Sequence, residues 1–101
     1  LAAARRDHER DRLLAIYTND IQAKVTRNWL RPAGIPDGTL CSIMINQLPS
    51  GEVIDVRTLN CAGGIALRRS VEAAVLRASP LPQPPDPDLF EREITFDFIV
   101  E

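Results

Sequence analysis

The sequence has few histidines and cysteines, two residue types that are common in catalytic and metal sites. It contains one histidine and two cysteines in 101 residues, whereas a structural zinc site takes four protein ligands. No serine or cysteine lies in a recognisable nucleophile motif, and Gly63-Gly64 lacks the lysine and hydroxyl residue of a phosphate-binding loop. We therefore expect no enzyme, no cofactor and no metal site.

Strong net charge and long apolar runs are also missing. A formal net charge of −2 argues against a nucleic-acid partner, because nucleic-acid-binding domains usually carry a strongly basic face. The sequence contains no run of 18 apolar residues that could span a bilayer and no stretch with the pattern of a signal peptide. With 45% hydrophobic and 26% charged residues, the composition is that of a globular domain. We expect the chain to be a piece of a longer protein.

Residues 1–30 are predicted to be helical. The part from 1 to 12 mixes alanine with charges of both signs and has no apolar face, so we interpret it as the end of an upstream helical region. An apolar stripe then begins at Leu13, which makes 13–101 the domain proper.

Two dipeptides indicate where this helix could break and where it ends. Asn19-Asp20 allows a break in it, and Arg31-Pro32 is predicted to end it, since a residue before proline is disfavoured in helical conformation. Tyr17 and Trp29 lie on the apolar stripe. We predict that both are core anchors rather than exposed interface anchors.

A β-hairpin is predicted over residues 40–59, with its turn at Pro49-Ser50-Gly51. A two-residue turn at Ser50-Gly51 would place two apolar sets on the same side of the sheet. These sets are Cys41, Ile43 and Ile45 in the first strand and Ile54 and Val56 in the second.

The remaining elements complete a small α+β fold. Residues 65–78 have a helical apolar face, and five prolines between 79 and 88 predict an extended strap. Residues 94–100 alternate as a strand with one buried face. We predict two layers, with the helices on one face of a three-stranded antiparallel sheet in the order 2-1-3. A parallel pairing of the second and third strands is the alternative.

Cys41 and Cys61 allow three interpretations: a disulfide, part of a metal site, or two buried thiols. Both lie at the open end of the hairpin, which favours a disulfide and with it an oxidising compartment. Strand parity after a two-residue turn would point Cys61 away from Cys41. A bulge, a three-residue turn, or a Cys61 beyond the ladder would remove this objection.

Several segments together resemble the TolA C-terminal domain family over about residues 14–101. The segments are Val25-Thr26-Arg27-Asn28-Trp29-Leu30-Arg31-Pro32, Leu48-Pro49-Ser50-Gly51-Glu52-Val53, Ser70-Val71-Glu72-Ala73-Ala74-Val75 and the strap at 79–87. The hairpin and helix are shared with TonB-like domains, whereas the Trp-Leu-Arg-Pro element and the strap favour TolA. Cys61-Ala62-Gly63 departs from the Ser-Ser-Gly type of stretch that is common in the family.

The resemblance implies a non-enzymatic domain of the Tol-Pal system in the periplasm. In that family an N-terminal inner-membrane helix, not in this chain, works with TolQ and TolR. The C-terminal domain binds TolB and Pal and supports outer-membrane integrity and constriction at division. The same domain is also exploited by two foreign ligands. These are colicins, which bind it during their import, and a minor coat protein of filamentous phage. The alternatives are a TonB-like transducer that binds outer-membrane receptors, or a small enzyme or ligand-binding domain, which would need a concave polar pocket.

A three-stranded sheet has two open edges to which a partner can add a strand. The second strand carries Glu52, Asp55 and Arg57, which blunt its edge. We therefore predict the last strand as the partner-binding edge, unless the first helix or the strap covers it. Its residues are Ile94, Thr95, Phe96, Asp97, Phe98, Ile99 and Val100.

Overall fold

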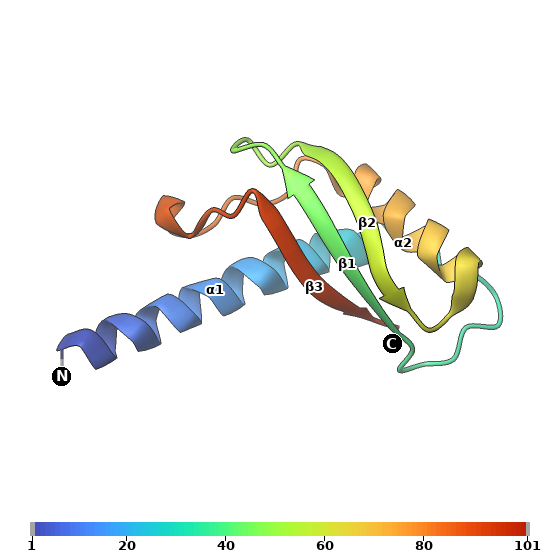
Figure 1. Ribbon diagram of the computed structural model, residues 1–101, viewed down its shortest axis with the longest axis horizontal. Helices are drawn as coiled ribbons and strands as arrows, with labels where there is room; N and C mark the ends of the chain where they lie inside the picture. The colour runs from blue at the N-terminus through green and yellow to red at the C-terminus, as the bar shows by residue number, and fades with distance from the viewer. Residues whose placement is uncertain (1, 101) are drawn as a thin grey trace.

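The computed structural model, shown in Figure 1, describes residues 2–100. Its elements are α1 (Ala2–Arg27), β1 (Leu40–Gln47), β2 (Val53–Cys61), α2 (Gly64–Ala78), the 3₁₀ turn η1 (Pro87–Leu89) and β3 (Glu93–Ile99). The strands form one antiparallel sheet in the order β2-β1-β3, and both helices lie behind it in Figure 1. This confirms the predicted α+β fold and its strand order, and it excludes the parallel alternative.

α1 is a single helix that runs through Asn19-Asp20 without a break, so the predicted break is wrong. The apolar stripe of Tyr17, Ile21 and Val25 repeats every four residues and is fully buried. Both Asn19 and Asp20 are exposed, and their poor helix propensity is outweighed by the packing of this stripe.

The prediction that α1 extends to Arg31-Pro32 is also wrong, because the helix ends at Arg27. The Asn28 side-chain amide donates to the Lys24 carbonyl at 2.9 Å, and the Asn28 backbone N–H donates to the Val25 carbonyl. These bonds satisfy carbonyls that the last helical turn leaves without partners. The chain therefore leaves the helix four residues before the proline-containing dipeptide begins.

The hairpin turn has three residues rather than the predicted two. The Leu48 N–H donates to the Glu52 carbonyl at 2.9 Å, and Gly51 adopts a positive φ of 91°. A bulge follows at Ile54, the residue left over between the pairs Asn46–Asp55 and Gln47–Val53. Ile54 is consequently 51% exposed, and the prediction that it shares the inner face with Val56 is wrong.

A second bulge in β2 reverses the parity of the strand again. Leu59 is left over between the pairs Ser42–Asn60 and Ile43–Thr58, and it is exposed. Beyond this bulge Cys61 lies directly opposite Cys41. The parity objection to a disulfide is removed in this way.

The core lies between the helices and the inner face of the sheet. Alternate residues of β1 face inward, and the small side chains of Ala74 and Ala78 let α2 lie close to the sheet. The buried cluster consists of Tyr17, Ile21, Val25, Cys41, Ile43, Ile45, Leu67, Val71, Ala74, Val75, Ala78, Leu81, Phe96, Phe98 and Val100.

The proline-rich segment crosses the hairpin turn as an extended strap. Leu81 is buried, and its N–H donates to the Gly51 carbonyl at 2.8 Å. An added Cβ on Gly51 would overlap the Leu81 backbone, so this crossing requires glycine. Farther along, Asp86 caps η1 by accepting from the Asp88 N–H, and Pro87 takes the first position of the turn.

Candidate docking edges of the sheet

The outer edge of β3 has backbone groups that do not pair with β1. The Gln47 N–H donates to the Arg92 carbonyl and the Val100 N–H donates to the Thr39 carbonyl, and the register between these two points has no bulge. Because hydrogen-bonded pairs alternate along an antiparallel ladder, every even-numbered residue of β3 faces β1. The N–H and C=O groups of Glu93, Thr95, Asp97 and Ile99 therefore point away from the sheet.

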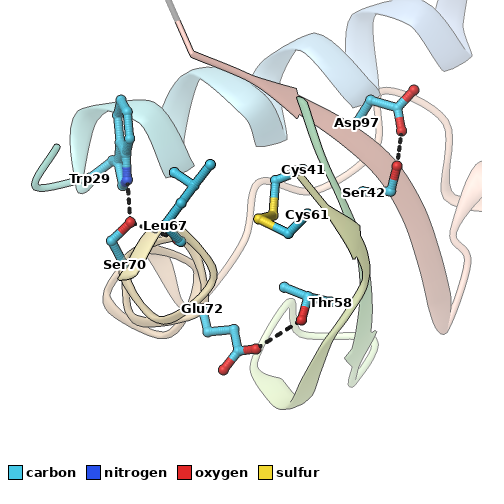
Figure 2. The surroundings of a disulfide bond; sticks show 9 residues. All are labelled: Trp29, Cys41, Ser42, Thr58, Cys61, Leu67, Ser70, Glu72 and Asp97. Carbon is cyan, nitrogen blue, oxygen red and sulfur yellow. Dashed lines mark hydrogen bonds between the residues drawn. A yellow bond between two sulfur atoms is a disulfide. The ribbon is translucent and has the colours of Figure 1, made fainter. Parts of the chain in front are cut away.

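The outer edge of β2 is partly covered at its start. The Val53 N–H donates to the Ser79 hydroxyl at 3.0 Å, and the strap continues across the turn next to it. Farther along, the Thr58 hydroxyl donates to Glu72 of α2 at 3.3 Å, and α2 packs against this strand (Figure 2). An extended segment consequently has less room at β2 than at β3.

A groove of about 460 Å³ adjoins the end of β3, between this strand and α1. Figure 1 shows α1 crossing behind the sheet, past β3. The groove is lined by Asn19, Gln22, Ala23, Thr26, Arg27, Trp29, Phe98 and Ile99. A strand added to β3 could direct alternate side chains into such a groove.

The residues predicted for the docking strand divide between two faces. Phe96, Phe98 and Val100 are buried in the core, and Ile94 packs against it. The other three, Thr95, Asp97 and Ile99, are exposed on the opposite face. There Asp97 accepts a hydrogen bond of 2.6 Å from the Ser42 hydroxyl (Figure 2). The predicted docking strand thus presents two polar residues and one isoleucine on its outer face and only apolar residues on its inner face.

Tyr17 lies in the core, where its hydroxyl accepts a hydrogen bond of 2.8 Å from the side-chain amide of Gln47. The same amide donates to the Glu91 carbonyl at 2.9 Å. Burial raises the pKa of the Tyr17 phenol above its ordinary value. Sequence reasoning missed Gln47, although its odd number places it on the inward face of β1 with Cys41.

Trp29 follows α1 and packs against the core while remaining partly exposed. Its indole N–H donates to the Ser70 hydroxyl of α2 at 2.9 Å, as Figure 2 shows. Its ring meets that of Phe98 edge to face, with centroids 4.9 Å apart. Trp29 therefore joins the end of α1 to both α2 and β3.

Cys41 and Cys61 form a disulfide, and their Cα atoms lie 4.0 Å apart. Figure 2 shows this bond between the open end of the hairpin and α2, near Leu67. It joins the end of β2 to β1 at the point where the chain turns into α2. The central strand is thereby bonded covalently to one neighbour and by its backbone to both.

These features define a class: small α+β domains that keep one edge of a three-stranded sheet open beside a long helix. The chain belongs to the TonB C-terminal family, whose model matches residues 14–98. Membership makes it a TonB/TolA-like protein-interaction domain of the cell envelope. Curated proteins gave no match. Within residues 2–100, no helix is both long and apolar enough to cross a membrane.

Two solved structures share the fold. One is the solution structure of TolAIII bound to a peptide derived from the N-terminus of TolB, with a TM-score of 0.59, 22% identity and coverage of 82% of this chain and 71% of that one. The other is the C-terminal domain of Helicobacter pylori TonB, with a TM-score of 0.58, 19% identity and coverage of 84% and 92%. This chain thus shares its fold with both structures.

Proposed function

We propose that this is a non-enzymatic periplasmic domain of the Tol-Pal system that binds an extended segment of TolB by adding it as a fourth strand to β3. The observation that carries the proposal is the row of outward backbone groups at Glu93, Thr95, Asp97 and Ile99. An added strand would satisfy these groups with little demand on its own sequence. The same edge could then also accept Pal, colicins or a phage coat protein.

The TolAIII structure supports the choice of TolB, since that relative of the same fold binds a TolB peptide. The Trp29-Leu30-Arg31-Pro32 element and the strap support the TolA branch. In this proposal residues 13–101 form the interaction domain, and residues 1–12 end a helical region that leads to an inner-membrane anchor and to TolQ and TolR. The domain would then serve outer-membrane integrity and constriction at division.

A TonB-like transducer is the second candidate. Two observations favour it: the matching family model is that of the TonB C-terminus, and the Helicobacter pylori TonB domain has nearly the same structural similarity as TolAIII. In this case the partner would be a segment of an outer-membrane receptor. The docking physics would be the same, and only the source of the strand would differ.

The test is an NMR titration of the oxidised domain with a peptide from the N-terminus of TolB of the same organism. We expect shifts at residues 93–99, slower amide exchange at Thr95 and Asp97, and new cross-strand contacts to the peptide. Shifts confined to β2 would contradict the choice of edge and keep strand addition. If no residue shifts, TolB's N-terminus is not the ligand, and a segment of a TonB-dependent receptor becomes the peptide to titrate.

A further inference from the structure

The groove beside β3 has walls of different chemistry. Asn19, Gln22 and Thr26 are three or four residues apart, so they form one polar stripe on α1. The Trp29 and Phe98 rings form the aromatic part of the lining. Arg27 is the charged residue of the groove, and none of the lining residues is acidic. The groove is therefore rich in hydrogen-bond donors and carries positive charge.

Three of these side chains have no partner among the residues that the structure describes. Among residues 2–100, no hydrogen bond or ion pair engages the side chains of Asn19, Gln22 or Arg27, whereas the Thr26 hydroxyl donates to the Gln22 carbonyl at 2.8 Å. Two carboxamides and a guanidinium supply several N–H groups that need acceptors. A carboxylate is a side chain that can accept from an amide or a guanidinium N–H and can also pair with the charge of Arg27.

The opposite face of β3 has the reverse charge. Glu93 and Asp97 are exposed there, on the side of the sheet that no helix covers. Side chains of an added strand alternate between the two faces. One set of its residues would therefore enter the donor-rich groove, and the other would lie beside the two carboxylates.

We propose that the groove selects the strand that docks on β3: the partner is an acidic-basic alternating segment, with carboxylates facing Arg27, Gln22 and Asn19 and basic side chains on the outer face. This inference rests on the proposed strand addition and adds the chemistry of the partner. Backbone pairing supplies affinity for any extended segment, while the charges fix its register and which face turns inward. Because the charges are exposed, the selection weakens at high salt.

The experiment is a selection from a display library of random ten-residue peptides, performed on the oxidised domain in low salt. We expect the recovered peptides to carry Asp or Glu at alternate positions, with Lys or Arg between them, and to slow amide exchange at Thr95 and Asp97. Synthetic versions of these peptides are then measured by calorimetry against variants. The Arg27→Glu variant should bind them about tenfold more weakly and should itself select lysine at the inward positions.

A matched control is Arg69→Glu, the same charge reversal on an exposed residue of α2 that does not line the groove. It should leave both the affinity and the recovered sequences unchanged. Because Arg27 also lies at the C-terminal end of α1, where a positive charge stabilises the helix, the neutral Arg27→Gln variant checks that weaker binding does not come from unfolding. It should lower the thermal midpoint less than Arg27→Glu does, remain folded at 25 °C, and lose part of the affinity.

The possible outcomes distinguish a failure of charge selection by the groove from a failure of strand addition to β3. Peptides that dock on β3 without alternating charge, or that bind Arg27→Glu as tightly as the native domain, overturn the inference and leave strand addition standing. Peptides whose exchange protection maps to β2 or away from the sheet edges overturn both. Alternating peptides with reversed preference in Arg27→Glu establish the groove as the selective element.

Discussion

Gln47 is the buried polar side chain of the described core, and it connects three segments. Its amide nitrogen donates to Tyr17 of α1 and to the Glu91 carbonyl ahead of β3, while its Oε1 has no partner within residues 2–100. Leaving a buried acceptor without a partner costs free energy. The two bonds from the nitrogen offset this cost and hold α1 at a defined position against the sheet.

The Tyr17–Gln47 contact predicts a dependence of stability on alkaline pH. Burial raises the Tyr17 pKa in the folded state, so the neutral phenol is favoured by folding. Its contribution is complete below about pH 10, the ordinary value for tyrosine, and is lost as the pH rises through the folded pKa. Urea unfolding of the native domain should therefore show a fall in free energy above pH 10 that is smaller in Tyr17→Phe.

The chain has a single tyrosine, so the absorbance of its phenolate gives the folded pKa directly. At neutral pH, Tyr17→Phe should cost about 1 kcal/mol, the usual value of one hydrogen bond. Parallel pH curves for the two proteins would show that Tyr17 ionises as freely in the folded domain as in the unfolded chain, and would contradict the prediction.

At the scale of elements, the hairpin shows which features the periodicity of apolar residues can predict and which it cannot. Alternation of apolar residues located both strands and the turn, and it placed Val56 on the same face as Ile43 and Ile45, where Val56 packs against the core. Alternation does not account for the exposure of Ile54 and Leu59, which lie at β-bulges. A bulge inserts one extra residue into a strand, and the amino-acid sequence does not mark where it occurs. Two exposed apolar residues in one strand can be explained only once the pairing is known.

Beyond the second bulge, the disulfide closes a loop with a sequence separation of 20 residues. Restricting such a loop in the unfolded chain stabilises the domain by about 3 kcal/mol on the chain-entropy model. The double variant Cys41→Ala, Cys61→Ala should lose about this amount in urea unfolding. Reduction of the native protein should have a similar effect, while dithiothreitol should not change the double variant. Equal stability of native and double-variant domains would show that the bond contributes nothing to folding.

The outer edge of β3 gives a prediction about binding without unfolding. The Thr95 N–H points away from β1, so Thr95→Pro removes a donor that the folded domain does not use, and edge positions tolerate proline. We expect the TolB peptide to lose at least tenfold in affinity, because an outward N–H is missing and the ring obstructs the added strand. Calorimetry measures the affinity, and circular dichroism checks that the variant is folded.

The corresponding variant at the other edge is Val56→Pro. The Val56 N–H also points outward, because its neighbours Asp55 and Arg57 are the residues that pair with β1. This variant should retain peptide binding if β3 is the docking edge, even where lost packing lowers its stability. Binding that survives Thr95→Pro and disappears in Val56→Pro would move the site to β2.

At the scale of the whole molecule, the α+β layers and the sheet order could be predicted, because each element has its own apolar face. The groove could not, since its lining comes from α1, the segment after it and β3, which are brought together only by folding. Its residues in α1 are polar and resemble any solvated helix face in sequence. A groove formed between two elements cannot be recognised from the sequence of either element alone.

The elongated shape of the molecule leads to the last prediction. Its principal extents are 49 × 26 × 21 Å, and Figure 1 shows the first part of α1 projecting beyond the sheet. Residues 7–12 are exposed, and the ion pair between Glu9 and Arg12 is internal to the helix. From residue 7 onward, the first fully buried residue of α1 is Tyr17. Over this described part of the helix, tertiary packing thus begins after residue 12.

A chain that starts at Leu13 should therefore keep the unfolding midpoint and the peptide affinity of the full chain, because it retains Tyr17, Ile21 and Val25, the residues of α1 in the buried cluster. A chain that starts at Gln22 loses Tyr17 and Ile21 from the core and should not fold at 25 °C, since each large core side chain contributes about 2–4 kcal/mol and a domain is stable by only about 5–15 kcal/mol. Thermal melts followed by circular dichroism measure both. If the chain from Leu13 melts well below the full chain, residues 1–12 belong to the domain and the boundary at residue 13 is wrong.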